Sequence, residues 1–88
     1  MTYKVEFTAT AMRFLKKLDK HQAKLIIAWI SKNLDNSTNP HAKGKALTGD
    51  LAGKWRYRIG DYRIITKIDD DRVLIEIINI GHRRDIYK

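Results

Sequence analysis

The chain has no cysteine and a single proline among its 88 residues. Without cysteine, neither a disulfide nor a thiolate-bound zinc site can hold the fold, so its stability must come from packing. The lack of disulfides fits a reducing compartment, and we expect a cytoplasmic protein. No apolar run approaches the ~20 residues that a membrane span needs, and the N-terminus lacks the apolar segment of a signal peptide. We therefore expect a soluble protein that does not bind membranes.

Acidic residues are few, with 10 Asp and Glu against 18 Lys and Arg, so the formal charge is +8. Such a charge attracts polyanions, and nucleic acid is the leading candidate. Lysines of the expected helices can equally form an ordinary solvated surface. The segment 54–67, KWRYRIGDYRIITK, is more specific, because it holds five basic residues and one acid in 14 positions. The length of the whole chain, 88 residues, predicts one domain, residues 1–88, with a small two-layer core.

The segment 54–67 alternates apolar and basic side chains around Gly60 and Asp61, which predicts a β-hairpin with a tight II′ turn. Counting outward from the turn, Arg58 faces Arg63 and Tyr57 faces Ile64. Alternation predicts two faces. The apolar face holds Trp55, Tyr57, Ile59, Tyr62 and Ile64, and the basic face holds Arg56, Arg58, Arg63 and Lys67. Two arginines at directly opposite positions repel by roughly 0.2 to 1 kcal/mol, so this face suits a bound anion.

The remaining pattern predicts the element order β-α-α-β-β-β. A short strand is expected over 3–7, followed by an amphipathic helix capped by Thr8 or Thr10. A break at Asp19 or Lys20 precedes a second helix that ends near Asp35 and places Trp29 in the core. The apolar run 73–80 predicts a central strand. This order is typical of an α+β domain in which a two-helix hairpin packs on one face of a mainly antiparallel four-stranded sheet.

Residues 36–53 are rich in glycine and small polar residues, and we expect a loop that Leu47 and Leu51 anchor to the core. Lys43 and Lys45 are candidates to approach a phosphate backbone, although no phosphate-binding loop motif surrounds them. In the C-terminal GHRRDIYK, we expect His82 to be a solvated side chain, and Tyr87 either packs on the sheet edge or lies near the basic face. No cluster of metal ligands is present, and we expect no metal site and no cofactor.

The C-terminal half resembles RelE-type toxins of the RelE/ParE superfamily of toxin–antitoxin systems. The similarity rests on four features: L-x-G before the hairpin, the [WY]-[RK]-x-[RK] strand, G-x-Y-R, and the G-x-R…Y ending within residues 47–87. The resemblance implies a ribosome-dependent endoribonuclease that cleaves messenger RNA in the ribosomal A site. It also implies an antitoxin partner, a hetero-oligomer with that antitoxin, and the ribosome with its messenger RNA as target.

By position in these motifs, the resemblance implies catalytic roles for Arg58, Arg83 and Tyr87. Phosphate binding is expected from Arg56, Arg63 and Lys54. Some relatives of this type have lysine where this chain has Arg58, and arginine hardly accepts a proton because its pKa exceeds ~12. Arg58 is therefore expected to stabilise charge, which leaves Tyr87, His82 or the ribosome as the route for the proton.

Two other functions fit the same fold. A ParE-like protein binds DNA gyrase without cleaving RNA, and a non-catalytic basic module only binds RNA. The clustered arginines together with Tyr87 favour the nuclease, because a gyrase inhibitor does not need them as a group.

Overall fold

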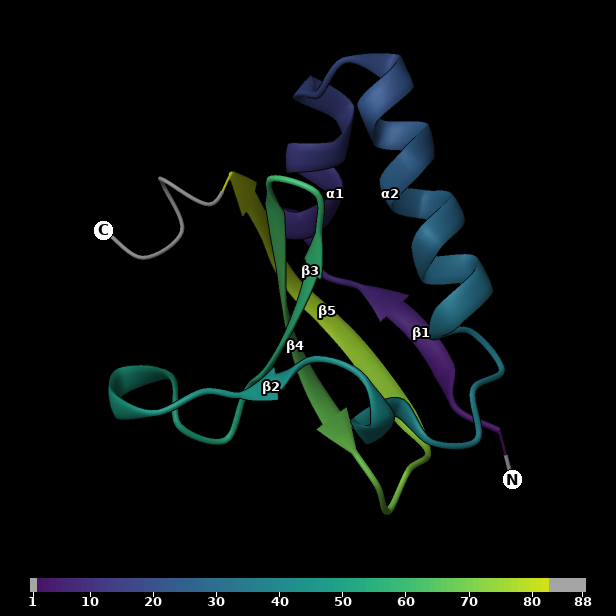
Figure 1. The fold of residues 1–88 in the computed structure, drawn as a ribbon, viewed down its shortest axis with the longest axis vertical. Coiled ribbons are helices and arrows are strands. Elements are labelled where there is room, and N and C mark those ends of the chain that lie inside the picture. Colours follow the sequence, from purple (N-terminus) through teal and green to yellow (C-terminus); the bar gives the residue numbers. More distant parts are fainter. Residues whose placement is uncertain (1, 83–88) are drawn as a thin grey trace.

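The computed structural model describes residues 2–82, and its elements surround one core between two helices and a sheet (Figure 1). The helices are α1 (Ala9–Lys17) and α2 (Lys20–Asn33), and two short 3₁₀ turns are η1 (Pro40–Ala42) and η2 (Gly49–Leu51). The strands are β1 (Lys4–Phe7), β2 (Lys45–Ala46), β3 (Trp55–Ile59), β4 (Tyr62–Asp69) and β5 (Leu74–His82).

Both helices begin at side-chain caps. The Thr8 hydroxyl accepts from the backbone N–H of Ala11 at 3.2 Å, so Thr8 rather than Thr10 begins α1. Asp19 accepts from the N–H of Gln22 at 3.3 Å and begins α2 at the predicted break. Each cap satisfies a donor that the first helical turn leaves without a backbone partner.

The sheet has five strands in the order β1-β5-β4-β3-β2, so the α+β class is confirmed and the predicted count of four was wrong. The additional strand is β2, which pairs antiparallel with β3. β1 pairs parallel with β5, and the other pairs are antiparallel. The apolar run at the C-terminal end of the chain is central, as expected, because β5 lies between β1 and β4.

The β3–β4 hairpin has the predicted register, with Arg58 opposite Arg63 and Tyr57 opposite Ile64. Gly60 has a φ of 57°, whereas Asp61 is not among the residues of positive φ. A positive φ at only the first central residue is the pattern of a II′ turn. The two-residue turn therefore fixes which side chains share a face.

A β-bulge interrupts the pairing of β4 with β5, because Ile65 faces Asn79 whereas Thr66 faces Ile77. Ile78 is the extra residue, and one extra residue reverses the alternation of a strand. Ile77 and Ile80 can therefore both reach the core, at 0% and 1% exposed.

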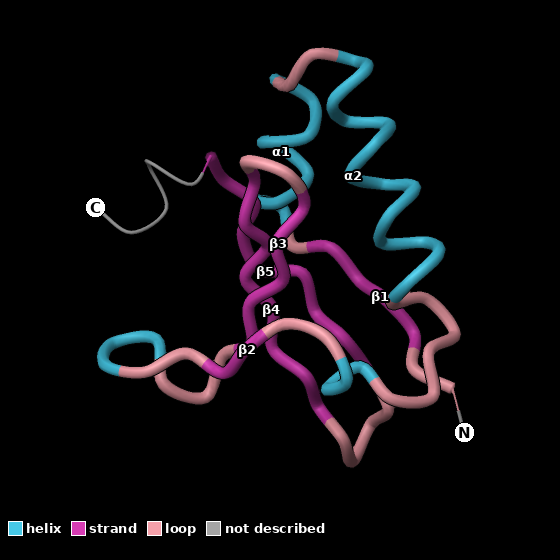
Figure 2. The backbone as a smooth tube through the Cα atoms, viewed as in Figure 1, coloured by secondary structure: helices cyan, strands magenta, loops and turns pink. Residues whose placement is uncertain are grey.

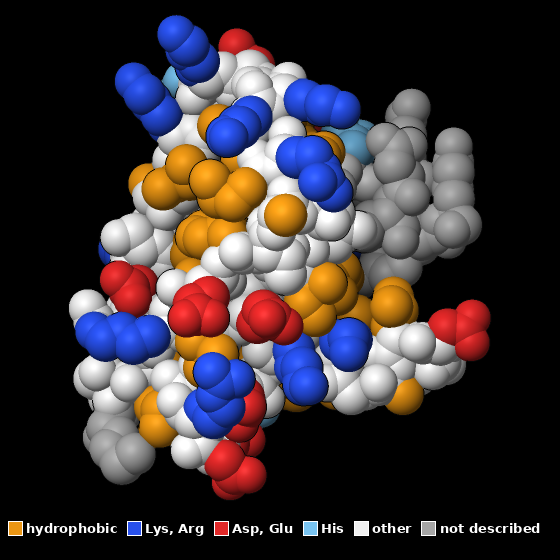
Figure 3. All heavy atoms as spheres, turned by 180° about the vertical axis from the view of Figure 1, so that it is seen from behind, with side chains coloured by type: hydrophobic (Ala, Val, Ile, Leu, Met, Phe, Trp, Pro, Cys, Tyr) orange, Lys and Arg blue, Asp and Glu red, His pale blue; other side chains and the backbone are white. Residues whose placement is uncertain are grey.

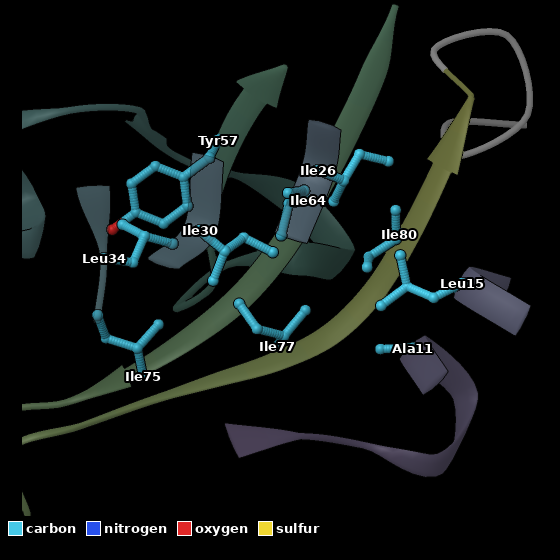
Figure 4. Close-up of a cluster of buried hydrophobic side chains, with 10 residues drawn as sticks. All are labelled: Ala11, Leu15, Ile26, Ile30, Leu34, Tyr57, Ile64, Ile75, Ile77 and Ile80. Atoms are coloured by element: carbon cyan, nitrogen blue, oxygen red, sulfur yellow. The ribbon is translucent and has the colours of Figure 1, made fainter. Parts of the chain in front are cut away.

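The two helices cover one face of the sheet (Figure 2). Buried side chains from both helices and from β3, β4 and β5 meet there (Figure 4): Ala11, Leu15, Ile26, Ile30, Leu34, Tyr57, Ile64, Ile75, Ile77 and Ile80. Trp29 packs against this cluster, and its ring lies 5.7 Å from that of Tyr57, as expected for a core residue.

The residues that hold segment 36–53 against the sheet differ from those that the sequence predicted. Leu47 and Leu51 are half-buried and lie outside the core cluster, so they do not anchor it. Instead the Tyr57 hydroxyl donates to the carbonyl of buried Pro40 at 2.6 Å, and the Trp55 indole donates to the carbonyl of Lys43 at 2.7 Å. These bonds bring the segment against β3 and allow β2 to pair.

Gly44 makes this close approach possible. Its φ is 78°, and a Cβ at this position would lie 2.2 Å from the carbonyl oxygen of Arg56. Only glycine meets both conditions without a shift of the backbone. The position of the following residue, Lys45, opposite Arg56 therefore depends on Gly44.

Candidate functional site

The candidate site is the sheet face opposite the helices, which we call the open face. Side chains directly opposite each other in a sheet share a face. The strand register therefore places Arg58 and Arg63 in one row that ends at Gly81, and Arg56 in a second row with Ile65. Three arginines that the sequence predicted on one face are thus brought together by β3 and β4.

Arg56 is half-buried, and its Nε is shielded from solvent and has no hydrogen-bond partner within residues 2–82. A buried donor that lacks an acceptor costs about 1 to 3 kcal/mol, and more when the group is charged. The guanidinium is therefore a site where an anionic ligand would gain a hydrogen bond at little desolvation cost. This geometry suits a phosphate oxygen.

The Arg58–Arg63 pair differs in exposure. Arg58 is exposed, and its Nε donates to the carbonyl of Gly60 at 3.4 Å, which holds the side chain toward the turn. Arg63 is half-buried, with Nε and Nη1 out of solvent. The more buried cation is the better fixed of the two, because less water competes for its donors.

Two lysines flank the arginines. Lys54 is half-buried and directly precedes β3, close to Arg56 in the chain. Lys67 lies on the predicted face but is paired in register with Glu76, so an acid lies beside it. The positive charge is therefore concentrated on β3 and the first half of β4.

The acidic turn after β4 lies at the far end of that strand from Arg63, and two neighbours hold Asp70 there. The Tyr3 hydroxyl donates to its carboxylate at 2.6 Å, and Nε2 of His41 lies 3.2 Å from the same oxygen. The Tyr3 hydrogen bond, followed by that of His41, lowers the pKa of Asp70. The carboxylate thus remains ionised in a cluster of its own, away from the arginines.

Arg83 and Tyr87, two of the predicted catalytic residues, lie outside the described residues. Their neighbour His82 ends β5 and was predicted to be solvated. That prediction was wrong, because His82 is half-buried and its ring meets the edge of Tyr62 with centroids 5.7 Å apart. The two rings form a packed corner beside the hairpin turn.

Within residues 2–82, no group of three His, Asp or Glu side chains is arranged to hold a metal ion. In the same part of the chain, no helix is both long and apolar enough to cross a bilayer. The guanidinium and ammonium groups on and beside β3 and the first half of β4 can bind phosphate oxygens and stabilise added negative charge.

One further residue joins the arginines on this face, and the sequence offered it only as a candidate to approach a phosphate backbone. Lys45 lies opposite Arg56 on β2 and extends its row by one strand. The available sequence signal was weak, since a two-residue strand leaves no periodicity to read. Gly44 before it was the usable clue, because an isolated glycine often marks a close backbone approach.

A second surface, the helical surface, is apolar. Met12, Leu25 and Ile27 are 40%, 49% and 47% exposed on α1 and α2. Two of them, Met12 and Ile27, line a groove between the helices and β1, together with Phe7 and Leu15. Figure 3 shows hydrophobic side chains gathered on this side of the molecule, below a rim of Lys and Arg. Apolar patches rimmed by charge are typical of protein-interaction surfaces.

Fold and site define a small α+β domain with two helices on one face of a sheet and clustered arginines on the other. The family described as "ParE toxin of type II toxin-antitoxin system, parDE" matches residues 5–87. The chain therefore belongs to the RelE/ParE superfamily of toxins of type II toxin–antitoxin systems, which confirms the resemblance seen in the sequence.

Relatives in Mycobacterium tuberculosis are similar over nearly the whole chain. Toxin RelG is 38% identical over 88 residues, which cover 100% of this chain and 99% of the relative. Toxin RelE is 41% identical over 86 residues, which cover 98% of this chain and 87% of the relative. A solved toxin–antitoxin complex, RelBE2 of the same organism, aligns with a TM-score of 0.80 at 35% identity, covering 94% of this chain and 100% of that chain.

Proposed function

We propose that this toxin is a ribosome-dependent endoribonuclease that cleaves messenger RNA in the ribosomal A site. The observation that carries the proposal is the open face itself, where three arginines share two adjacent rows and a buried donor of Arg56 meets no acceptor in the described part of the chain. A polyanion with closely spaced phosphates matches that arrangement. The two curated relatives named RelG and RelE support the same assignment.

The reaction is a transesterification. The ribose 2′-oxygen attacks the adjacent phosphorus as its proton is removed, and the bond from phosphorus to the 5′-oxygen breaks. The products are a 2′,3′-cyclic phosphate and a 5′-hydroxyl that has gained a proton. The protein must align the attacking and leaving oxygens and stabilise the charge on the phosphate.

The described residues suit the charge-stabilising part of this chemistry. Arg63, half-buried at the centre of the face, and Arg56 hold phosphate oxygens, and Lys54 adds charge beside Arg56. Arg58 is more exposed and stabilises the developing negative charge without accepting a proton. By resemblance, Arg83 assists the leaving 5′-oxygen and Tyr87 stacks on a base or transfers a proton.

We also propose that a cognate antitoxin binds this toxin in a hetero-oligomer. The solved relative with a TM-score of 0.80 is described as a toxin–antitoxin complex. The exposed apolar side chains of α1 and α2 give a partner apolar area to bury, and the excess of basic residues favours an acidic partner. Co-purification of the toxin with the product of an adjacent acidic reading frame would test this partnership.

The decisive experiment is induction of the toxin in cells, followed by mapping of RNA 5′ ends and a test for DNA breaks linked to gyrase. Arg63→Gln is expected to reduce cleavage within translated codons by roughly 100- to 1000-fold, the effect of removing one preorganised charge-stabilising donor. Arg13→Gln removes the same charge from the exposed surface of α1 and should cleave normally.

The alternative action on gyrase is favoured by the description of the matched family, which names ParE. Breaks in DNA with intact messenger RNA would establish that action and reject the nuclease. A third result, RNA binding without new 5′ ends or DNA breaks, would make the open face a binding module only.

A further inference from the structure

We propose that Lys45, Arg56 and Asn79 form a second phosphate subsite, next to the Arg58–Arg63 row, and that Asn79 contacts the RNA directly. This inference rests on the proposed function for its choice of ligand. It assigns a role to Asn79, which no sequence motif pointed to, and places it in one row with Lys45 on the other side of Arg56.

The register places the three side chains in one row. Lys45 faces Arg56, Arg56 faces Ile65, and Ile65 faces Asn79, across β2, β3, β4 and β5. Neighbouring strands lie about 4.8 Å apart, so Arg56 and Asn79 lie roughly 10 Å apart on either side of Ile65. Ile65 is 4% exposed and forms the apolar floor between them.

The β-bulge sets the orientation of the Asn79 carboxamide. Its Oδ1 accepts from the backbone N–H of Ile80 at 2.9 Å, directly after the extra residue Ile78. A backbone N–H can only donate, so the atom that it meets must be the amide oxygen. No hydrogen bond of Nδ2 is found among the described residues, so its two N–H groups can donate to a ligand. Arg56 supplies the matching observation on the other side, because its buried Nε has no acceptor among the residues that the structure describes.

The spacing of the two rows fits a nucleic-acid backbone. Residues two apart on a strand share a face and lie roughly 6.6 to 6.8 Å apart. Arg56 and Arg58 therefore offer donors to two successive phosphates of a strand that runs along β3. One phosphate lies over Arg58 and Arg63, and its neighbour lies over the Lys45–Arg56–Asn79 row.

The test measures binding of the full-length toxin to a short 2′-O-methyl RNA, which has no 2′-hydroxyl nucleophile and cannot be cleaved by the proposed route. We expect Asn79→Ala to raise Kd roughly tenfold, the effect of losing a hydrogen bond to a charged group. Its dependence on salt should match that of the unmodified protein, because no cation is lost. Lys45→Ala should reduce the slope of log K against log salt by about 0.7, one phosphate contact on a single strand.

Asn79→Asp separates a contact with RNA from a role in the strand. The carboxylate can still accept from the N–H of Ile80 but cannot donate to phosphate, so we expect binding at least as weak as that of Asn79→Ala. Recovery of tight binding in Asn79→Asp would show that only the bulge mattered and would overturn the proposal. Asn36→Asp makes the same chemical change in an exposed turn, where the side chain contacts Lys4, and should leave Kd unchanged.

The outcome is separable from that of the proposed function. If the unmodified toxin produced no RNA 5′ ends in cells, the nuclease would be rejected, and the difference in Kd between the variants of Asn79 and Asn36 would still decide the subsite. If the toxin cleaved RNA and the Asn79 variants bound and cleaved normally, the subsite alone would be overturned.

Discussion

The two faces of the sheet use alternate residues of the same strands and differ in nearly every property. On the covered face, Tyr57, Ile64 and Ile80 lie side by side across β3, β4 and β5, each no more than 1% exposed. On the open face, the next row holds Arg56 and Asn79 around Ile65. The covered face packs against the helices, whereas the open face holds cations that do not contribute to the core.

This difference separates stability from function along a single strand. Burial of an isoleucine or tyrosine contributes about 1.5 to 3 kcal/mol, so the covered face stabilises the domain. The open face opposes it, because Arg58 lies opposite Arg63 and Arg56 has a buried donor that finds no acceptor between residues 2 and 82. Such a face is consistent with selection for ligand binding.

The largest effect is expected on the covered face, from Ile64→Ala. Ile64 is 0% exposed, and truncation of a buried isoleucine typically costs about 2 to 5 kcal/mol. An 88-residue domain without disulfides has little stability in reserve, so we expect a largely unfolded variant. Urea denaturation monitored by circular dichroism measures the loss. Arg63 is the adjacent residue on the other face, and the Arg63→Gln variant should keep its fold. Equal destabilisation by Ile64→Ala and Arg63→Gln would contradict the division between the faces.

A smaller loss is expected from Tyr57→Phe, which removes the hydrogen bond to the Pro40 carbonyl while keeping the ring. A buried acceptor left without its donor costs about 1 to 3 kcal/mol, and the segment that carries β2 should loosen. Thermal unfolding and hydrogen exchange at Lys45 would measure both effects. Tyr62→Phe is the matched control, because no hydrogen bond of its hydroxyl is found within residues 2–82, and it should unfold like the unmodified protein.

The same residue predicts a response to alkaline pH. Burial raises the pKa of Tyr57 well above its ordinary value of about 10. Above about pH 10 the tyrosine of the unfolded chain loses its proton while that of the folded protein keeps it. The unfolded state then binds fewer protons, so the free energy of unfolding falls as pH rises. Unfolding measured from about pH 9 to 11 should show this decline in the unmodified protein and a weaker decline in Tyr57→Phe. Identical pH profiles would mean that the phenol is not buried as described.

The sequence was sufficient for the hairpin because a two-residue turn fixes the register, and the register fixes the faces. The alternation around Gly60 and Asp61 alone thus placed Arg56, Arg58 and Arg63 together. The helices followed from their caps and periodicity, with Thr8 and Asp19 as the capping residues.

The parts that the sequence did not predict depend on contacts between distant residues. β2 is two residues long and exists because Gly44 allows the chain to approach Arg56. The bulge at Ile78 carries no local signal in an apolar run, although it decides the position of Asn79. The anchor of the long segment 36–53 was missed because it is a hydrogen bond from Tyr57 to a carbonyl, a group that every residue has.

The smallest effect tests whether the open face lowers the stability of the free toxin. Arg58→Gln removes the repulsion across the Arg58–Arg63 pair and should stabilise the protein by roughly 0.2 to 1 kcal/mol, while cleavage of RNA declines. The gain should shrink as salt is raised, because the repulsion of exposed charges is screened. Urea denaturation at low and high salt measures it, with Arg13→Gln as the control for a lower net charge. If Arg58→Gln kept full activity and gained no stability, the Arg58–Arg63 pair would be an ordinary solvated surface. A pair that is kept to bind an anion should instead lose activity when its repulsion is removed.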